Sequence, residues 1–405
     1  MSKDVVIIGA GAAGLMTAAW AGQQKRESGR RVILLDGAKK LGAKILVAGG
    51  GRCNVTHHQV DAAAFAGGSR NAIKKILRRF DVAQTTDFFK QHGVQLKREE
   101  TGKLFPVTDQ ARTVLDALLG AVTQAGGEIL HPRRVSAVTQ EKDGRFLIQG
   151  DWGQMRAEKI VLATGGKSIP KSGSDGYGYR LAQGLGHSLT EPIFPALVPL
   201  TLHKDHFLCQ LRGITLPAQF DLWSSSQKRL QTFANSTLLT HFGLSGPAVL
   251  DMSRYYLAAK AADTQTTLTV NWIPRMTPEQ FDQALLSLGK KQPISLLRAH
   301  LPERMARALL EQSGISDGPL TRVLRKKLVS LVTRYPLPLS GDRGYNYAEV
   351  TAGGVPLTEI NLKTMESRIC PNLFFAGEIC NVDGRIGGFN FQWAWSSGYV
   401  AGISL

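Results

Sequence analysis

The sequence predicts an α/β fold in which a parallel-sheet domain is interrupted by an inserted β-rich domain and a small helical lobe. Three observations lead to this prediction. An apolar run near the N-terminus passes directly into closely spaced glycines. Two later apolar runs, within residues 158–166 and 372–377, also end in glycine. Between residues 192 and 342 the pattern changes to strand-like alternation and then to helical periodicity.

The chain has 405 residues, which is longer than one ordinary hydrophobic core supports. We expect residues 1–191 and 343–405 to form one discontinuous domain. Residues 192–275 and 335–342 are expected to form the inserted β-rich domain, as the alternation in "GITLPAQFDLW" indicates. Residues 276–334 are expected to form a small basic helical lobe, because "PERMARALLEQSG" has helical periodicity.

The N-terminal segment predicts a buried strand, a tight turn and a helix. The run "VVII" is entirely apolar, as expected of a parallel strand that is covered on both faces. The following glycines form the pattern G-x-G-x-x-G. In this pattern Gly9 permits the turn, Gly11 lets a pyrophosphate approach the backbone, and Gly14 lets the helix pack against the strand. The free N–H groups of the helix N-terminus suit phosphate oxygens.

A second strand, "RRVILLD", follows this helix and ends at Asp36, 22 residues after Gly14. An acidic residue at the tip of that strand can accept hydrogen bonds from ribose hydroxyls. A glycine fingerprint alone would be weak support for nucleotide binding. The strand, fingerprint, helix, second strand and terminal acid together predict a Rossmann-type dinucleotide-binding domain.

Two later segments favour FAD over a nicotinamide as the bound cofactor. "EKIVLATGG" (158–166) is an apolar strand that runs into a Gly-Gly turn. "NLFFAGEICNVDGRIGGFNFQWAWSSG" (372–398) is a third strand that ends in Gly377-Glu378 and is followed by Gly387-Gly388 at a helix start. Both are typical of FAD-binding Rossmann domains of the glutathione-reductase type. A second G-x-G-x-x-G unit is missing, so we expect NAD(P)H to bind only transiently, as an electron donor.

The residues expected to bind FAD come from these segments and from a glycine loop between them. They are Gly9, Gly11, Ala13, Gly14, Asp36, Lys44, Gly49, Gly50, Gly51, Arg52, Cys53, Asn54, Val135, Ala163, Thr164, Gly165, Gly377, Glu378, Gly387, Gly388, Phe389 and Asn390.

The loop "AGGGRCNVT" carries the first candidate for a catalytic residue. Cys53 is a candidate general acid, and the neighbouring Arg52 could lower its pKa. The alternatives are that Cys53 is a small buried residue beside the cofactor, and that Arg52 binds the pyrophosphate or a substrate carbonyl. His241, in "THFGLSGPA", is the second candidate acid or substrate contact, with a structural role as its alternative. The four cysteines are far apart, so we expect neither a disulfide framework nor a metal site.

The charge balance predicts a polyanionic partner. The chain has 49 Lys and Arg against 32 Asp and Glu, a formal net charge of +17. An enzyme for a small molecule does not need this excess, whereas a nucleic acid would be attracted by it.

Two stretches concentrate the charge, and we expect both to bind RNA. "SRNAIKKILRRF" contains no acidic residue, and residues 275–334 contain eleven basic against five acidic residues. The alternative is that each is an ordinary solvated helix face. The predicted RNA-binding residues are Arg70, Lys74, Lys75, Arg78, Arg79, Arg325, Lys326 and Lys327.

Four further stretches carry a specific resemblance. They are "KILVAGGGRCNVT" (44–56), "LLTHFGLSGPAVLDMS" (238–253), "AEVTAGGV" (348–355) and "GGFNFQWAWSSG" (387–398). With them, the chain resembles the BaiN/RdsA family of FAD-dependent oxidoreductases over essentially its whole length. The resemblance implies a split FAD domain with a β-rich insertion and a helical lobe, and the reduction of activated C=C bonds.

The two branches of this family imply different substrates. One implies conversion of a uridine in 23S ribosomal RNA to dihydrouridine, and the other implies reduction of a steroid-like enone. A flavin-loaded RNA-binding or redox-sensing protein is the third possibility. No apolar run is long enough for a signal peptide or a membrane span, so we expect a cytoplasmic protein without a membrane partner. The oligomeric state is left open.

Overall fold

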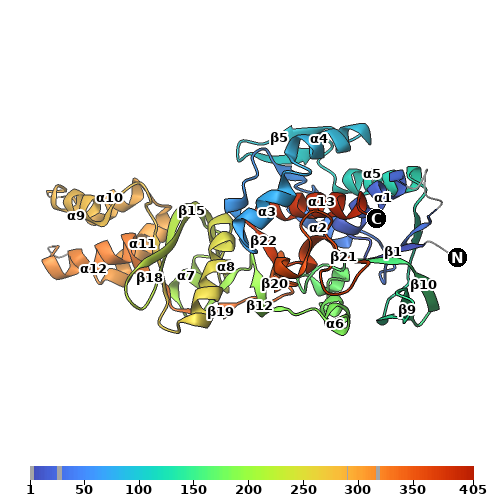
Figure 1. The fold of residues 1–405 in the computed structure, drawn as a ribbon. Helices are drawn as coiled ribbons and strands as arrows, with labels where there is room; N and C mark the ends of the chain where they lie inside the picture. Colours follow the sequence, from blue (N-terminus) through green and yellow to red (C-terminus); the bar gives the residue numbers. More distant parts are fainter. Residues whose placement is uncertain (1–3, 25–29, 290, 316–319) are drawn as a thin grey trace. The chain divides into compact units, whose positions relative to one another are not determined.

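The computed structural model describes residues 4–24, 30–289, 291–315 and 320–405 (Figure 1). The chain divides into two compact units. The first comprises the chain up to Pro195 together with Glu349–Leu405, and the second comprises Ala196–Ala348. The division therefore falls a few residues after each of the boundaries expected at 191/192 and 342/343.

The first unit is built on a five-stranded parallel sheet in the order β21-β11-β1-β2-β7. These strands are β1 (Val5–Ile8), β2 (Val32–Leu35), β7 (Glu128–Leu130), β11 (Lys159–Leu162) and β21 (Leu373–Phe375). Every residue of β1 and β2 is buried, as the apolar runs predicted. The four strands predicted from the nucleotide-binding segments, which are β1, β2, β11 and β21, thus lie side by side in one sheet.

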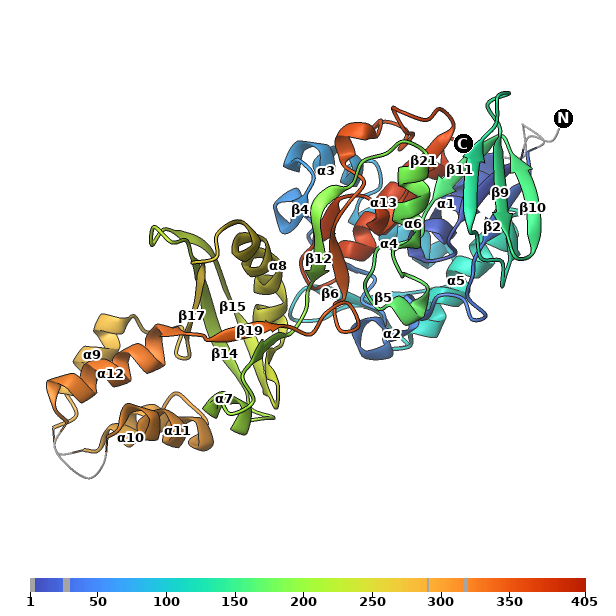
Figure 2. The same ribbon diagram turned by 90° about the horizontal axis from the view of Figure 1, so that it is seen from below.

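Helices cover this sheet, and two of them pack very closely (Figures 1 and 2). Helix α1 (Ala12–Gln24) lies along α13 (Phe389–Gly402). A Cβ atom on Gly398 would lie 2.7 Å from the carbonyl oxygen of Ala13, and one on Gly402 would lie 2.6 Å from that of Thr17. The close approach therefore requires glycine at both positions of α13, because any side chain would push the helices apart.

The remaining elements of the first unit surround this layer. Its other helices are α2 (Ala43–Gly51), α3 (Arg70–Leu77), α4 (Val82–Gln91), α5 (Ala111–Gln124) and α6 (Tyr177–Gly184). Small antiparallel sheets are formed by β3 (Thr56–His57), β6 (Lys103–Pro106) and β5 (Leu96–Arg98); by β4 (Phe65–Gly67) and β22 (Val382–Gly384); and by β8 (Ala137–Gln140), β9 (Phe146–Gly150) and β10 (Gly153–Ala157). Strands β12 (Thr190–Ala196) and β20 (Val350–Gly354) pair with each other.

The second unit contains a seven-stranded sheet in the order β18-β17-β14-β15-β16-β13-β19. Its paired strands are antiparallel. They are β13 (Leu200–Leu202), β14 (Thr215–Trp223), β15 (Arg229–Thr240), β16 (Gly243–Ser245), β17 (Thr267–Asn271), β18 (Tyr335–Pro336) and β19 (Leu339–Asp342). The alternating burial along β14 agrees with the alternation in its sequence.

The helices of the second unit share one hydrophobic core with this sheet. They are α7 (Phe207–Gln210), α8 (Pro247–Ala262), α9 (Pro278–Leu286), α10 (Pro293–Arg298), α11 (Glu303–Ser313) and α12 (Arg322–Thr333). Phe281, Leu297 and Leu328 of the expected helical lobe are buried in the same cluster as Leu268 and Val270 of β17. The segment 276–334 is thus helical as expected, but it does not have a core of its own.

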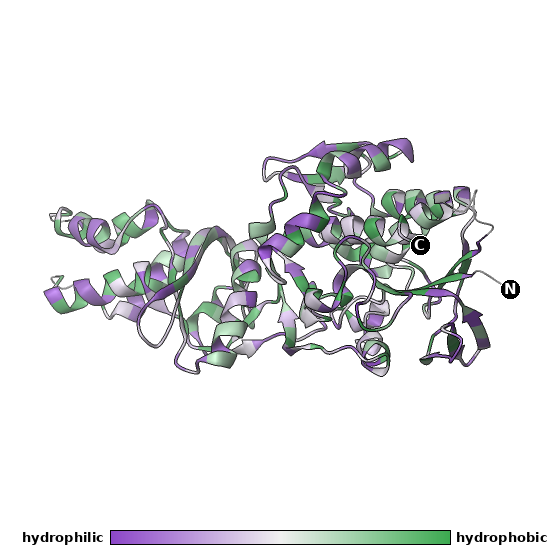
Figure 3. Cartoon of the chain, viewed as in Figure 1, coloured by the Kyte–Doolittle hydropathy of each residue, from purple (hydrophilic) through white to green (hydrophobic). Residues whose placement is uncertain are grey.

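Hydrophobic (green) and hydrophilic (purple) residues are mixed along many of the helices, as Figure 3 shows. Within the described ranges, no helix is long and apolar enough to cross a membrane.

Candidate active site

A cavity of about 740 Å³ opens in the first unit, a volume within the range of about 300–1,000 Å³ that is typical of ligand sites. Gly9, Asp36 and Ala163, which directly follow strands β1, β2 and β11, all line it. The cavity thus lies at the carboxyl edge of the parallel sheet, where ligands bind in open α/β folds.

The glycine fingerprint shapes one wall of the cavity. Gly9 has a positive φ of 106°, and a Cβ on Gly14 would lie 1.8 Å from the carbonyl oxygen of Gly9. Gly14 therefore permits the helix-to-strand contact that its position predicted. Gly11 differs, since a Cβ there would meet no protein atom within 4 Å, and Gly11 lines the cavity. The space in front of Gly11 is thus left open for a ligand.

Asp36 is held rigidly at the end of β2. Its Oδ2 accepts a hydrogen bond from the backbone N–H of Ala10 at 2.7 Å, and its Oδ1 accepts one from Ala38 at 2.7 Å. The carboxylate joins the glycine turn to the end of β2 and lines the cavity. An acceptor fixed in this way suits the hydroxyls of a ribose.

Lys44 and Glu378 meet at the cavity wall from segments far apart in the sequence. The Nζ atom of Lys44, on α2, lies 2.5 Å from Oε2 of Glu378. The other carboxylate oxygen of Glu378 accepts a hydrogen bond from the backbone N–H of Thr351 at 2.9 Å. Both side chains are mostly buried and line the cavity. They hold α2 against the C-terminal segment beside the space a ligand would occupy.

Three buried polar atoms on the cavity wall have no hydrogen-bond partner among the described residues. They are Oγ1 of Thr164, Oγ of Ser174 and Oδ1 of Asn54. Buried polar groups are normally satisfied, so these atoms await a partner that the protein does not supply. Together with the open space at Gly11, they show that the residues present fit a bound dinucleotide such as FAD.

Nearly all residues expected to bind FAD line this cavity. Gly14, Gly51, Cys53 and Phe389 do not. Gly14 and Phe389 instead lie behind the wall, where Gly14 packs on Gly9 and Phe389 is stacked with His57 at a centroid distance of 5.1 Å.

The three consecutive glycines are explained by backbone conformation. Helix α2 loses helical geometry at Ala48, and Gly49, Gly50 and Gly51 have φ angles of 58°, 70° and 86°. Residues that carry a Cβ atom are strained in this left-handed region, whereas glycine is not. A Cβ on Gly49 would also lie 3.0 Å from the ring of Phe105, so the loop packs tightly on β6.

Arg52 directs its charge away from Cys53. Its Nη1 atom lies 2.6 Å from Oε1 of Glu99 and 3.6 Å from Oδ1 of Asp109, and its guanidinium lies 4.0 Å over the ring of Phe105. Arg52 lines the cavity, but two carboxylates already balance its charge. Its principal contacts therefore fasten the glycine loop to β6 and to residues just beyond β5 and β6.

The expectation that Arg52 lowers the pKa of Cys53 is wrong. The thiol is completely buried, and burial raises its pKa to about 12 because a thiolate would be desolvated there. Cys53 has a positive φ of 60°, which is uncommon for a residue other than glycine. All four cysteines are free. A catalytic role of Cys53 stays a prediction.

His241 lies in the second unit, on the exposed turn between β15 and β16. Its ring meets Phe242 edge-on, with centroids 5.1 Å apart. The lining of the cavity comes from the first unit. A catalytic role of His241 therefore also stays a prediction.

Sequence reasoning missed Lys103, which lies on β6 and lines the cavity. Its Cε atom is 3.6 Å from the position that a Cβ on Gly387 would take, at the start of α13. No motif marks Lys103, because its position follows from the pairing of β6 with β3. We call the part of the cavity lined by Asn54, Lys103, Phe105, Gly387 and Gly388 the β6 end.

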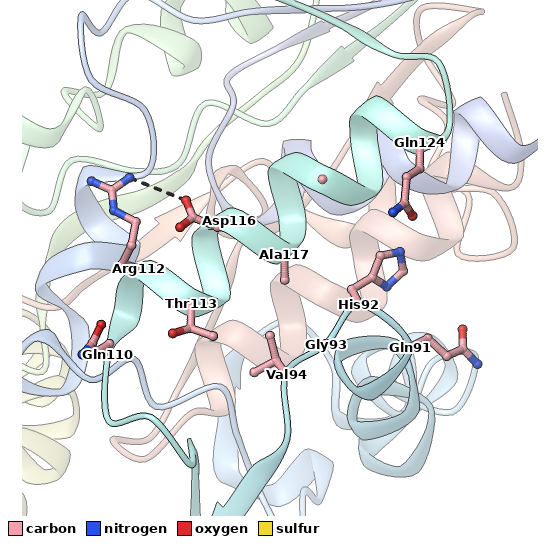
Figure 4. Close-up of a pocket in the computed structure, with 11 residues that line it drawn as sticks. Gln91, His92, Gly93, Val94, Gln110, Arg112, Thr113, Asp116, Ala117 and Gln124 are labelled. Atoms are coloured by element: carbon pink, nitrogen blue, oxygen red, sulfur yellow. Dashed lines mark ion pairs between the residues drawn. The ribbon is translucent and has the colours of Figure 1, made fainter.

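A second pocket lies between the end of α4 and helix α5, as Figure 4 shows. Its charged residues, Arg112 and Asp116, lie 3.8 Å apart and are exposed. It contains none of the residues predicted to have a function. In the described part of the chain, no group of three or more His, Cys, Asp or Glu is arranged to hold a metal ion.

The two basic stretches differ in how free their charges are. The five predicted RNA-binding residues of α3 and its C-terminal end are exposed, while Ile73 and Ile76 are buried. No ion pair between described residues involves any of these five. In α12, by contrast, Arg325 and Lys326 lie 2.9 and 2.8 Å from the carboxylate of Asp282. The α3 stretch is therefore the stronger candidate for binding a polyanion.

Fold and site together define an FAD-dependent oxidoreductase with a Rossmann-type domain. The chain belongs to the HI0933-like family, since the model of the HI0933-like protein Rossmann domain matches residues 3–404.

Similarity to curated proteins extends over the full length of the chain. It is 35% identical to "Ribosomal RNA dihydrouridine synthase" of Escherichia coli (strain K12), over 99% of this chain and 98% of that protein. It is 34% identical to the protein of the same name from Haemophilus influenzae, over 100% and 98%. It is 31% identical to "3-dehydro-bile acid delta(4,6)-reductase" of Clostridium scindens, over 98% and 97%.

Among solved structures, 3-ketosteroid delta1-dehydrogenase from Sterolibacterium denitrificans is similar with a TM-score of 0.52 and 11% sequence identity, covering 99% of both chains. At this identity the similarity shows a shared fold.

Proposed function

We propose that this chain reduces a uridine of large-subunit (23S) ribosomal RNA to dihydrouridine, with FAD as cofactor and NAD(P)H as electron donor. The observation that carries the proposal is the full-length similarity to two proteins named ribosomal RNA dihydrouridine synthase. The net charge of +17 and the unpaired basic residues of α3 support a polyanionic substrate.

The proposed reaction adds two hydrogen atoms across the C5=C6 bond of uracil. NAD(P)H and one proton are consumed, and NAD(P)⁺ and dihydrouridine are formed. When bound, FAD would supply the hydride-transfer chemistry that links the nicotinamide to C6 of the uracil. A proton must then be added at C5, because the uracil C4 carbonyl makes C6 the electrophilic carbon and C5 the basic one. The protein must therefore hold the base, supply a proton and exclude water.

We assign parts of the cofactor to parts of the cavity. The backbone at Gly9 and Gly11 would hold the pyrophosphate, and Asp36 would accept hydrogen bonds from the ribose. Lys44 and Glu378 would contact the ribityl chain. With the adenosine assigned to the Asp36 side of the cavity, the flavin ring would lie at the β6 end.

The β6 end offers both a hydrogen-bond acceptor and a hydrogen-bond donor, which the base and its carbonyl groups need. The unpartnered Oδ1 of Asn54 can accept a hydrogen bond, and the ammonium of Lys103 can donate one. Lys103 and the free N–H groups at the start of α13 would stabilise negative charge on a carbonyl oxygen there. Cys53 and His241 are the proton donors that the sequence predicted. We do not assign the proton transfer to Cys53, because its thiol is completely buried and does not line the cavity.

The RNA would be held mainly through its backbone. A base inside a helix cannot reach a cavity of this kind, so the target uridine must be unpaired or flipped out. Contacts from Lys74, Lys75, Arg78 and Arg79 would position the RNA without reading its sequence. A ribosomal substrate also implies action in the cytoplasm.

Reduction of a small enone is the second candidate, favoured by the similarity to a protein named bile-acid reductase. The third candidate is a flavin-loaded RNA-binding or redox-sensing protein. Mapping dihydrouridine in ribosomal RNA from a strain that lacks this gene separates the first two. Loss of dihydrouridine at one uridine, restored by the wild-type gene, supports the proposal; unchanged ribosomal RNA contradicts it. Rapid-mixing measurement of flavin reduction by NADPH tests the third candidate, which predicts negligible reduction.

A further inference from the structure

The second unit contains a stacked arginine that none of the functions above uses. The guanidinium carbon of Arg343 lies 3.6 Å from the centroid of the Tyr347 ring and 4.2 Å from that of Phe242, over both rings. Aromatic faces attract a cation, but they do not satisfy its N–H groups. Among the described residues, the Arg343 side chain has no carboxylate and no hydrogen-bond acceptor as partner.

The order of strands brings these three residues together. Strand β13 lies between β16 and β19, with Leu200 opposite both Leu244 and Asp342. Phe242 directly precedes β16 and lies beside Leu202, and Arg343 directly follows β19 and lies beside Pro199. Because β13 is only three residues long, the side chain of Arg343 reaches the ring of Phe242 across it. Segments far apart in the sequence thus meet through the register of one central strand.

A tight turn then returns Tyr347 to Arg343. The backbone N–H of Arg343 donates to the carbonyl oxygen of Pro199 at 3.1 Å, which fixes the start of the turn. Oδ1 of Asp342 accepts the N–H of Gly344 at 2.7 Å, and the N–H of Tyr347 donates to the carbonyl oxygen of Gly344 at 3.1 Å. The carboxylate nearest in sequence is therefore engaged with the backbone, and the turn holds the ring in place.

The stacked cluster of Arg343, Tyr347 and Phe242 is partly exposed to solvent, since Arg343 and Phe242 are half-buried and Tyr347 is exposed. Tyr347 is 54% exposed, which is unusual for a large aromatic side chain, and His241 beside Phe242 is also exposed. A planar cation with free N–H groups suits a phosphate, and an exposed aromatic face suits a base. A free small anion would not use the exposed ring, and a duplex would offer no unstacked base.

We propose that Arg343, Tyr347 and Phe242 bind one nucleotide of single-stranded RNA. Arg343 donates hydrogen bonds to its phosphate, and its base stacks on the exposed ring of Tyr347. This site rests on the proposed function, because it presumes an RNA substrate. It differs from the α3 surface in that it selects unpaired RNA, whereas surface lysines and arginines bind any phosphate backbone.

The test uses the full FAD-loaded chain and a short fluorescein-labelled oligouridylate, with binding followed by fluorescence anisotropy at several salt concentrations. Tyr347→Ala should weaken binding about tenfold and leave the salt dependence unchanged, because stacking is not ionic. Arg343→Met should weaken binding and also reduce the salt slope by about 0.7, the value for one phosphate of a single strand. Arg343→Lys should bind more weakly than wild type with an unchanged slope, because it keeps the charge and loses the planar fork.

Arg334→Lys is the matched control, because Arg334 also lies over an aromatic ring, 4.6 Å from the centroid of Trp223 in the same unit. It should bind as wild type. An abasic oligonucleotide of equal length should be insensitive to Tyr347→Ala. The proposal is overturned if Tyr347→Ala weakens binding of the intact and the abasic oligonucleotide equally. It is also overturned if all Arg343 and Tyr347 variants melt at the wild-type temperature and bind with wild-type affinity. Dihydrouridine mapping remains separate: its failure refutes the ribosomal substrate, and the binding experiment still decides the nucleotide site.

Discussion

Gly11 and Gly14 belong to one fingerprint, yet the structure predicts opposite consequences of replacing them. In Gly14→Ala the new Cβ would lie 1.8 Å from the carbonyl oxygen of Gly9, whereas real Cβ atoms keep about 3.0 Å from backbone. Helix α1 must therefore move by about 1 Å from β1. Overpacking of this kind costs about 1–3 kcal/mol, which lowers the melting temperature of a unit of this size by about 3–10 °C.

Gly11→Ala meets no protein atom within 4 Å, so the FAD-free protein should melt at the wild-type temperature. The added methyl occupies the open space in the cavity where the pyrophosphate is expected. FAD affinity should therefore fall, and the stabilisation that FAD provides should fall with it. That stabilisation is about 2.7 kcal/mol for a ligand at a hundred times its Kd.

The assay is thermal unfolding of each protein with and without added FAD, together with the flavin absorbance retained after gel filtration. Gly14→Ala should lower the melting temperature of the FAD-free protein, and Gly11→Ala should remove only the shift on adding FAD. Gly22→Ala serves as a control for close packing away from the cavity, because its Cβ would lie 2.5 Å from the carbonyl oxygen of Ala125. Normal FAD retention by Gly11→Ala would refute the placement of the pyrophosphate.

Four further outcomes are expected. Charge reversal of Lys74, Lys75, Arg78 and Arg79 should weaken RNA binding and reduce its salt dependence. Charge reversal of Arg325 and Lys326 should weaken RNA binding less, because Asp282 already pairs with both residues. Equal weakening by the two sets would contradict the conclusion that the α3 stretch is the stronger candidate. Cys53→Ala should retain FAD and turnover, since the thiol is fully buried outside the cavity lining, and loss of product with FAD retained would instead make Cys53 the acid. Lys103→Met should lower the flavin midpoint potential by on the order of 30 mV, which is about 1.4 kcal/mol for two electrons. Lys97→Met is the control, because Lys97 pairs with Asp109 and does not line the cavity. Burial holds the pKa of His187 below its ordinary value of 6.5 despite hydrogen bonding to Glu359. Because the unfolded chain then binds more protons than the folded one, the free energy of unfolding should fall as pH drops below about 6.5. In chemical denaturation at several pH values, His187→Gln should show a shallower fall.

The cofactor segments could be predicted because their demands are local. Gly9, Gly49, Gly50 and Gly51 have positive φ angles, which glycine adopts without strain, so their requirement is visible in the sequence. The apolar run of β1 is likewise explained by its burial on both faces. Asp36 directly follows β2 and Glu378 comes three residues after the end of β21, and the parallel sheet brings both strand ends to one edge.

The residues that sequence reasoning misjudged depend on distant partners. Cys53 and Arg52 are neighbours in the loop, but the thiol is completely buried in the fold, whereas the guanidinium pairs with Glu99. Lys103 enters the cavity only because β6 pairs with β3 in one register. The helices of 276–334 have the predicted periodicity, yet only the folded unit reveals that they share the core of the β-sheet.

The sequence by itself thus determined the class of fold, the cofactor and the segments that line the cavity, because backbone conformation and burial are recognisable within a few residues. The tertiary structure alone decided which side chains face the cavity, which charges remain free and where Arg343 meets Phe242 and Tyr347. The physical reason is that these contacts join elements distant in the sequence, and strand order and register set them rather than any local pattern.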